Sequence, residues 1–409
     1  VGAGLCGALA AAALARRGWQ VKVLEAAPEP AAGASGLPVG LLAPIASRDD
    51  NIRSRLSRAG VRATLEICHA LLQAGQDWSA TGVLEQRPDA GSSALLGSWR
   101  QGNVAWSEAS HAWSEAAPAW PTAQPDGVAG AQHMGPTDDS GATWHSRAGW
   151  IKPARLVRAC LRQSGVTFEG GRKIHALRRN GDEWRLLDVH GSVLAQAPQV
   201  VLACTADCVN LLDSARADSE LLQSSLRTSD FPGEVTSHPT RLDTMVAVAG
   251  QVSWDWQHAQ EARTFPPFPV NGSGSFVPHV PIDGARAWFA GATYSTMPFS
   301  EGNVASAHLE NLQRLSTLLP EVAKALRVHF ADGDVKAWVG TRYTTADRLP
   351  VVGAPDCAML RGLWVSTGMG SRGLTFAALA AELLAARLGG EPLPMEARLA
   401  RSLAIERGS

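Results

Sequence analysis

Apolar and polar positions at the start of the chain predict a helix followed by a buried strand. The Ala- and Leu-rich stretch Leu5–Arg17 predicts a helix, which Gly18 ends. The short apolar run Val21–Leu24 predicts a strand of a parallel sheet, because such strands are covered on both faces. A helix leading into a buried strand is typical of the doubly wound α/β class.

The pattern then alternates between helical and extended segments. Residues 215–335 predict mostly strand and loop, with strands at 244–253 and 287–293, and we interpret this stretch as a second domain inserted into the first. Elsewhere the pattern predicts helices over 52–75 and 154–163, a hairpin over 173–193 and a buried strand over 199–203.

The end of the chain contains a second turn rich in glycine. Leu363–Ser366 predicts a strand, the turn Gly368–Gly373 follows, and the apolar stretch Leu374–Leu388 predicts a helix. The backbone amides at the start of such a helix can face negative charge on a bound group.

Length and composition indicate a globular protein with more than one domain. The chain has 409 residues, too many for one ordinary hydrophobic core. The formal net charge of -1 gives no overall attraction to nucleic acid, so any RNA contact would depend on local basic clusters. Such clusters are usually solvated helix faces. The candidates are Arg48, Arg53, Arg55, Arg58, Arg62, Arg155, Arg158, Arg162, Arg172 and Lys173.

The six cysteines are scattered along the chain, which suggests reduced thiols in a cytoplasmic protein. Cys204 and Cys208 have the spacing of half a metal site, but no second Cys or His pair completes it, so we predict no metal. No apolar run is long enough to predict a membrane span or a signal peptide.

Gly2, Gly4 and Gly7 form a G-x-G-x-x-G motif directly before the first predicted helix. In a dinucleotide-binding unit the first glycine permits a tight turn, the second lets the backbone approach a pyrophosphate, and the third lets the helix pack closely on the sheet. Glu25 ends the next strand where an acid binds a ribose 2′-hydroxyl, which favours FAD or NAD over NADP. The second glycine turn, at the far end of the chain, favours a flavin.

Only Val1 represents the strand that should lead into this glycine turn, so the chain looks truncated upstream. That strand is central in a doubly wound sheet. We therefore expect a polypeptide that starts at Val1 to bind a dinucleotide poorly.

A short repeat, Trp-Ser-Glu-Ala, occurs at Trp106 and again at Trp113. A spacing of seven residues would place both indoles near one face of a helix. A satellite core or a lid is the plainer interpretation, and a platform for stacking bases is the alternative.

Six stretches carry a family resemblance: VGAGLCGALAAAALARRGW, GASGLPVGLLAP, GWIKPARL, AGQVS, TRYTTADRLPVVG and GMGSRGLTFAALAAELLAARLGGEPLP. In them the chain resembles the FAD-dependent amine oxidoreductases of the D-amino-acid oxidase and glycine oxidase type. More narrowly, it resembles the FAD domains of the bifunctional tRNA 5-methylaminomethyl-2-thiouridine biosynthesis proteins. It departs from their pattern at Leu37 and at Cys204-Thr-Ala, both near the expected flavin.

The resemblance implies a Rossmann-like FAD-binding domain of the glutathione-reductase type with an inserted antiparallel-sheet substrate domain. The FAD-binding domain is then expected in three parts, over residues 1–75, 149–214 and 336–409. A substrate or lid region is expected over 76–148 and the substrate domain over 215–335.

The activity that the resemblance implies is the oxidation of a glycine unit in tRNA. The substrate would be 5-carboxymethylaminomethyl-(2-thio)uridine at the wobble position, and the products 5-aminomethyl-(2-thio)uridine and glyoxylate. A methyltransferase domain that uses S-adenosylmethionine is expected upstream or in trans, and the protein is expected in the cytoplasm.

Residue roles are also implied. Arg342 matches the arginine that binds the substrate carboxylate in glycine oxidases, and a guanidinium fork suits that group, although a structural salt bridge is the alternative. Tyr343 and Tyr294 are candidate pocket residues, and Arg348 and Arg372 are second candidates for anion contacts. The expected FAD-binding residues are Gly2, Gly4, Leu5, Gly7, Glu25, Ala34, Ser35, Gly36, Gly368, Gly370, Ser371, Arg372, Gly373 and Leu374.

Two other functions remain open at this point. A free amino-acid oxidase or dehydrogenase acting on glycine, sarcosine or a D-amino acid would use the same flavin and Arg342. A flavoprotein scaffold that binds tRNA or a methyltransferase without turnover is the alternative outside catalysis.

Overall fold

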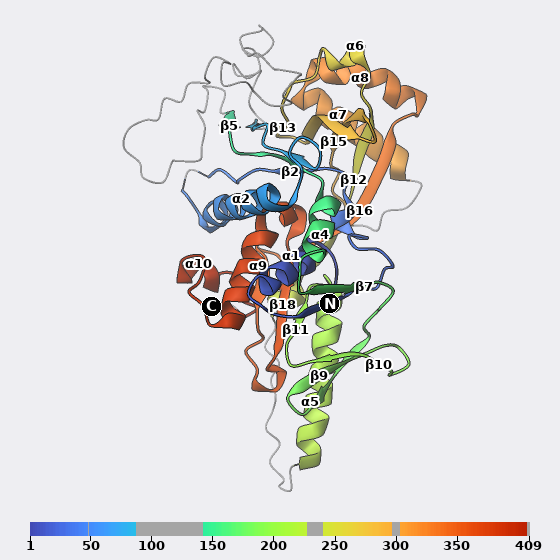
Figure 1. Cartoon of the computed structure of the whole chain (residues 1–409). Helices are drawn as coiled ribbons and strands as arrows, with labels where there is room; N and C mark the ends of the chain where they lie inside the picture. The colour runs from blue at the N-terminus through green and yellow to red at the C-terminus, as the bar shows by residue number, and fades with distance from the viewer. Residues whose placement is uncertain (48, 87–141, 227–239, 297–302, 407–409) are drawn as a thin grey trace, which may run out of the picture. The chain divides into compact units, whose positions relative to one another are not determined.

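The computed structural model describes residues 1–47, 49–86, 142–226, 240–296 and 303–406, which form two compact units (Figure 1). The first unit comprises Val1–Gly36, Ala154–Val248 and Arg342–Ser409, and the second comprises Leu37–Pro153 and Ala249–Thr341. The five-segment division from the sequence places its first boundary at residue 75 and remains a prediction. Arg48, Trp106 and Trp113 lie outside the described residues.

Parallel strands form the centre of the first unit. Strand β1 (Val21–Leu24) pairs in parallel with β7 (Val166–Glu169), and β11 (Val200–Leu202) pairs in parallel with β18 (Leu363–Thr367). Strand β17 (Val351–Gly353) pairs with β18 in the opposite direction. The predicted α/β class is thereby confirmed. The unit also contains α1 (Leu5–Ala15), α4 (Pro153–Leu161), α5 (Asp207–Leu226), α9 (Gly373–Gly389), α10 (Ala397–Arg401), the antiparallel strands β8 (Ala176–Asn180), β9 (Glu183–Leu187) and β10 (Val193–Ala197), and the 3-10 turns η1 (Ala34–Gly36), η2 (Arg241–Thr244), η4 (Ala358–Leu360) and η5 (Gly370–Arg372).

Helix α1 ends at Ala15, two residues before the predicted end at Arg17. Gly18 has a left-handed backbone, with φ of 85°, and the Trp19 amide donates to the Leu14 carbonyl at 3.2 Å. Arg16 and Arg17, the last residues of the predicted helix, therefore belong to a closing turn that depends on Gly18.

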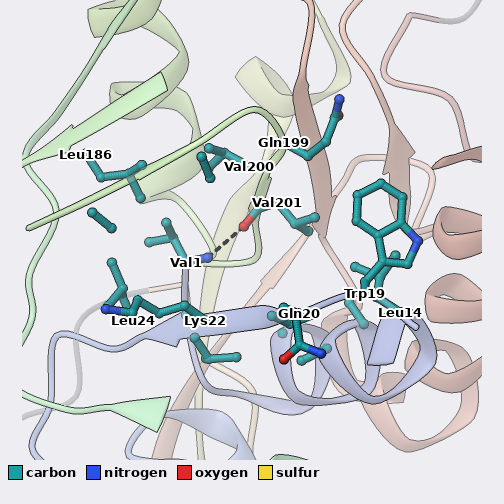
Figure 2. Close-up of a pocket in the computed structure, with 18 of the residues that line it drawn as sticks. Val1, Leu14, Trp19, Gln20, Lys22, Leu24, Leu186, Gln199, Val200 and Val201 are labelled. Atoms are coloured by element: carbon teal, nitrogen blue, oxygen red, sulfur yellow. Dashed lines mark hydrogen bonds between the residues drawn. The ribbon is translucent and has the colours of Figure 1, made fainter. Parts of the chain in front are cut away.

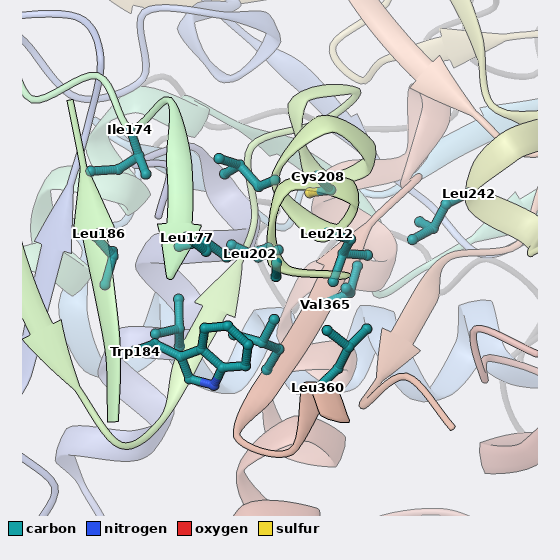
Figure 3. Packing of buried hydrophobic residues seen from close by; sticks show 14 of the residues in the cluster. Ile174, Leu177, Trp184, Leu186, Leu202, Cys208, Leu212, Leu242, Leu360 and Val365 are labelled. Atoms are coloured by element: carbon teal, nitrogen blue, oxygen red, sulfur yellow. The ribbon is translucent and has the colours of Figure 1, made fainter. Parts of the chain in front are cut away.

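The core of the first unit joins β9, β11, α5 and β18 (Figure 3). Trp184 is fully buried there, and its indole nitrogen donates to the Arg361 carbonyl at 3.0 Å, which satisfies its one polar atom. The side chains around it include Leu177, Leu186, Leu202, Cys208, Leu212, Leu360 and Val365.

A mixed sheet forms the second unit, in the order β16-β12-β15-β14-β13-β4-β5. Its strands are β4 (Val83–Glu85), β5 (Thr143–His145), β12 (Val246–Trp256), β13 (Val270–Asn271), β14 (Ser275–Ile282), β15 (Ala285–Gly291) and β16 (Lys336–Thr344), of which β12 and β16 each begin or end in the first unit. The remaining elements are β2 (Gly40–Leu42), β3 (Trp78–Ser79), β6 (Gly149–Ile151), α2 (Ile52–Leu71), α6 (Ala259–Ala262), α7 (Val304–Leu318) and α8 (Pro320–Asp332).

The prediction that residues 215–335 are mostly strand and loop is wrong for the second half of α5 and for the helices α7 and α8. Asn311 on α7 is 1% exposed, and its side chain donates to the Gln251 carbonyl at 3.1 Å and to Ser253 Oγ at 3.0 Å. A polar residue on the buried face interrupts the apolar period by which a helix is recognised. In the part of the chain that the structure describes, every helix is too short or too polar to cross a membrane.

A groove of about 410 Å³ separates β1 from β11 in the first unit (Figure 2). Val1 and Gly2 bridge its inner end: the Val1 nitrogen donates to the Val201 carbonyl at 2.7 Å, and the Gly2 amide donates to the Leu24 carbonyl at 2.8 Å. Ala10, Ala11 and Leu14 of α1 and Leu186, Ala195 and Ala197 line the rest of the groove. Val1 and Gly2 thus pair with both flanking strands, as residues of a strand between β1 and β11 would.

We predict that a strand of about five alternating apolar residues joined to Val1 raises the free energy of unfolding. Burial of two or three Val or Ile side chains in the groove contributes at least about 3 kcal/mol before chain ordering, and the strand also pairs with the backbones of β1 and β11. Denaturant unfolding and FAD retention provide the measurement. A Gly-Ser extension of equal length is the control, and equal stability and FAD retention for both extensions would contradict the prediction.

Candidate cofactor site

The first glycine turn closes only because its residues lack side chains. Gly2 has φ of 99°, and a Cβ there would lie 2.6 Å from the Ala203 carbonyl oxygen. A Cβ at Gly7 would lie 1.8 Å from the Gly2 carbonyl oxygen. Gly4 is different, because the nearest atom to its missing Cβ is Ser35 Oγ, at 3.2 Å. Gly2 and Gly7 thus shape the turn, while a Cβ at Gly4 would meet only the Ser35 side chain among the described residues.

Two side chains hold neighbouring loops against this turn. The Glu25 carboxylate accepts from the Ala3 amide at 2.6 Å and from the Ala27 amide at 3.0 Å. Ser35 Oγ accepts from the Leu5 amide, in the first turn of α1, at 3.0 Å. The loop that contains Ala34, Ser35 and Gly36 and the acid at the end of β1 therefore converge on the start of α1.

The second glycine turn lies beside the first. Gly368 and Gly370 have φ of 72° and 57°, and a Cβ at Gly373 would lie 3.2 Å from Leu5 Cδ1. Helices α1 and α9 run side by side (Figure 1). Leu374 is buried, whereas Ser371 is exposed. All the residues expected to bind FAD thus belong to the first unit.

Neither helix has an acidic residue of its own in the first turn, and at α1 the Glu25 carboxylate is bound to the Ala3 amide just before the helix. An anion at α1 and a second negative group at α9 are favoured by this arrangement. The space beside Gly4, the carboxylate of Glu25 and the two helix starts fit a dinucleotide that carries a ring system able to take negative charge.

Arg342 and Tyr343 lie near the end of β16, both partly buried. Two positions beyond Arg342, Thr344 pairs with Met369 of the second glycine turn, and Thr344 Oγ1 lies 3.1 Å from the position of a Cβ on Gly370. Because alternate residues of a strand share a face, Arg342 lies on the same side of β16 as Thr344.

The other candidates are more dispersed. Tyr294 belongs to the second unit, is 55% exposed, and has the Arg314 guanidinium 5.8 Å from its ring centre. Arg348 is exposed, with φ of 59°, and Arg372 is partly buried at the end of η5.

Arg241 and Asp347 form an ion pair that sequence reasoning missed, because 106 positions separate them. Asp347 Oδ1 accepts from Arg241 Nη2 at 2.9 Å, from Thr345 Oγ1 at 2.8 Å and from the Leu349 amide at 2.9 Å. Burial alone would raise the pKa of Asp347, but these hydrogen bonds outweigh it and hold that pKa below its usual value of 3.8. The network fixes the loop that follows Arg342.

We predict that Asp347→Asn lowers the free energy of unfolding by about 2 kcal/mol at pH 7, because hydrogen bonds to a charged group are lost. A depressed carboxyl pKa stabilises the fold above the unfolded-state value and ceases to do so as the pH falls through the folded value. The difference between variant and parent in denaturant unfolding should therefore narrow below about pH 4. Asp356→Asn, at an exposed position, is the control, and a constant difference across this range would contradict the prediction.

The basic clusters are divided between the units. Arg155, Arg158 and Arg162 are exposed along one face of α4 in the first unit, while Arg58 on α2 in the second unit forms an ion pair with Asp50. Within the described ranges no group of three or more His, Cys, Asp or Glu side chains is arranged to hold a metal ion.

Comparison with known proteins gives the family. The sequence pattern of the FAD dependent oxidoreductases matches residues 1–387. A tRNA 5-methylaminomethyl-2-thiouridine biosynthesis bifunctional protein of Albidiferax ferrireducens is 46% identical over 413 residues, which cover 100% of this chain and 58% of that protein. A protein of the same name from Polaromonas naphthalenivorans is 44% identical and covers 98% and 58%. The chain therefore spans about three fifths of the length of these relatives.

Solved structures agree on the fold. Glycine oxidase from Geobacillus kaustophilus has a TM-score of 0.64 at 17% identity, covering 100% of this chain and 97% of the other. Iminodiacetate oxidase from a Chelativorans species has a TM-score of 0.62 at 21% identity, covering 99% and 97%. The family match confirms the predicted cofactor and type of enzyme, and these structures confirm the predicted fold class. From the glycine turns to the family match, the observations agree that the chain belongs to the FAD dependent oxidoreductases.

Proposed function

We propose that this chain catalyses the FAD-dependent oxidation of the glycine unit of 5-carboxymethylaminomethyl-(2-thio)uridine at the wobble position of tRNA. The observation that carries the proposal is the pair of adjacent glycine turns at α1 and α9, in a chain that is 46% identical to a tRNA 5-methylaminomethyl-2-thiouridine biosynthesis protein. A cytoplasmic location and a methyltransferase partner, in the same polypeptide or separate, complete the proposal.

The first unit supplies the groups that would hold FAD. The backbone at Gly4 and the start of α1 suit the pyrophosphate, because a side chain there would occupy the phosphate position. Glu25 suits the ribose hydroxyls: a carboxylate has about four acceptor sites, of which the Ala3 and Ala27 amides take two. The start of α9 suits the flavin ring.

When bound, FAD supplies a two-electron acceptor for the hydride of the glycine methylene group. Loss of that hydride and of the N–H proton leaves an imine, and addition of water to the imine gives the primary amine and glyoxylate. Arg342 is proposed to hold the glycine carboxylate, so that the methylene group faces the acceptor. Tyr343 and Tyr294 are proposed as pocket residues. A protein nucleophile is not needed for this sequence of steps.

The exposed basic face of α4 supports a polyanionic substrate. Arg155, Arg158 and Arg162 are spaced to share one side of the helix. With an overall charge of -1, a local face of this kind is what would attract tRNA phosphates.

Analysis of the products tests the proposal. The FAD-loaded protein is incubated with tRNA bearing 5-carboxymethylaminomethyl-uridine, the tRNA is digested, and its nucleosides are identified by mass spectrometry while glyoxylate is trapped as a hydrazone. We expect 5-aminomethyl-uridine and glyoxylate in equal amounts. Alanine at Arg155, Arg158 and Arg162 together should slow the reaction of tRNA and leave the affinity for FAD unchanged. Glyoxylate from free glycine or sarcosine with intact tRNA would instead assign the chain to the amino-acid oxidases.

A further inference from the structure

Two thiols touch at the start of α5, directly behind the first glycine turn. The sulfur atoms of Cys204 and Cys208 lie 3.6 Å apart. Cys208 is fully buried in the apolar cluster of the first unit, where Figure 3 labels it, while Cys204 is partly exposed. A fully buried thiol thus contacts the thiol of a residue that is partly exposed.

The backbone holds both thiols in this position. The Asp207 amide donates to the Cys204 carbonyl at 3.2 Å, and the Cys208 amide donates to the Thr205 carbonyl at 3.3 Å. Thr205 has a left-handed backbone, with φ of 58°, and its hydroxyl donates to the Cys204 carbonyl at 2.7 Å. A disulfide bond of about 2.05 Å needs the sulfurs to approach by only about 1.5 Å, a distance that side-chain rotation and a small shift of this turn can provide.

The same turn supports the cofactor site. The Ala203 amide donates to the Val1 carbonyl at 2.8 Å. The Ala203 carbonyl oxygen and the Cys204 nitrogen lie 2.6 Å and 3.2 Å from the position of a Cβ on Gly2, so the two backbones are in close contact. The backbone of Ala203 and Cys204 therefore supports the first glycine turn from behind.

We propose that Cys204 and Cys208 form a reversible disulfide by exchange with a low-molecular-weight disulfide such as oxidised glutathione, and that closing it weakens FAD binding. The Cys204 thiolate attacks one glutathione sulfur and releases one glutathione thiolate. The Cys208 thiolate then attacks the Cys204 sulfur of the mixed disulfide and releases the second glutathione. Two protein thiols are oxidised and one glutathione disulfide is reduced, and the two protons released by the protein thiols pass through solvent to the two glutathione thiolates.

The surroundings of Cys204 make the first step of this exchange slow and the second step fast. The hydrogen bond with the Cys208 thiol, and then burial, raise the pKa of Cys204, so little thiolate is present at neutral pH. Because the pair lies in one turn, the second step is intramolecular and follows the first quickly.

Mass spectrometry of the FAD-loaded protein after long incubation with oxidised glutathione tests the disulfide. Both cysteines fall in one tryptic peptide, Leu186–Arg216. We expect this peptide to lose the mass of two hydrogens, to resist alkylation, and to recover both thiols with dithiothreitol. Cys208→Ser should stop at a glutathione adduct on Cys204, while the control Cys357→Ser should behave as the parent does. A glutathione adduct that persists on Cys204 in the parent would overturn the disulfide. So would alkylation of both Cys204 and Cys208 in a sample in which Cys357 has reacted with oxidised glutathione.

FAD titration of the reduced and oxidised protein, followed by flavin fluorescence, tests the second part. We expect the dissociation constant to rise at least about fivefold on oxidation, the lower end of ordinary coupling between two sites. Cys204→Ser, which cannot close the bond, should show no change after the same treatment. Equal dissociation constants for the reduced and oxidised parent overturn the link to FAD.

Discussion

Gly4→Ala is expected to leave the chain folded and to weaken FAD binding about 10- to 100-fold, because the new methyl group takes the place of the pyrophosphate. The loss of one charged hydrogen bond, which contributes about 1.5 to 3 kcal/mol, gives a change of this order. The only atom near the new methyl group in the protein itself is Ser35 Oγ, at 3.2 Å, and a small shift can relieve that contact. Flavin fluorescence titration gives the affinity, and denaturant unfolding without FAD gives the stability.

Two companion variants make the result specific. Gly33→Ala should match the parent in both measurements, because a Cβ there meets nothing within 4 Å. Gly7→Ala should lose stability as well as FAD, since its Cβ would lie 1.8 Å from the Gly2 carbonyl oxygen. Parent-like FAD affinity in Gly4→Ala would show that the pyrophosphate lies elsewhere.

Arg342→Ala is expected to lower kcat/KM for the glycine-bearing substrate by about 10- to 150-fold, which corresponds to one lost charge-assisted contact of about 1.5 to 3 kcal/mol. Arg342→Lys should recover part of the loss, because it restores the charge without the bidentate fork. Stopped-flow measurement of flavin absorbance gives the rate of the first step, apart from reoxidation.

A substrate without the carboxylate shows whether Arg342 acts by binding that carboxylate or by stabilising the fold. Arg342→Ala and the parent should oxidise an N-methyl analogue at similar slow rates, because neither then has a carboxylate to hold. Arg348→Ala serves as the comparison at the second candidate, which is exposed. If Arg348→Ala has the larger effect on the glycine-bearing substrate, the carboxylate role passes to Arg348.

Local patterns in the sequence predict the first unit well. Val21–Leu24 is a strand with the expected bounds, because Gly18 ends the preceding helix and the charged Glu25 follows its apolar residues. The helix expected from Leu374 begins one residue earlier, at Gly373. These elements depend on neighbours in the chain, so their pattern is visible without the fold.

Contacts between distant residues account for most of what was missed. The buried Asn311 obtains its partners from β12, and without them it is typical of a surface position. Arg241 and Asp347 pair only after η2 and the loop before β17 are brought together. Cys204 and Cys208 have the spacing of metal ligands, and only the folded chain shows that the two sulfurs contact each other.

The groove beside Val1 has one feature that the sequence predicts and one that it does not. The glycine motif predicts a central strand leading into the turn, and Val1 and Gly2 lie between β1 and β11 as that motif requires. The shape of the groove depends on small residues of α1 and on Leu186, which the motif does not specify.

An anaerobic titration of the FAD-loaded protein tests the central claim most directly. Flavin absorbance is followed after the addition of tRNA bearing 5-carboxymethylaminomethyl-uridine, and in parallel after sarcosine, glycine and D-alanine. We predict that the tRNA bleaches the flavin at micromolar concentration while the free amines do not. Bleaching by the free amines alone, with the tRNA inert, would contradict the claim and make this chain an amino-acid oxidase.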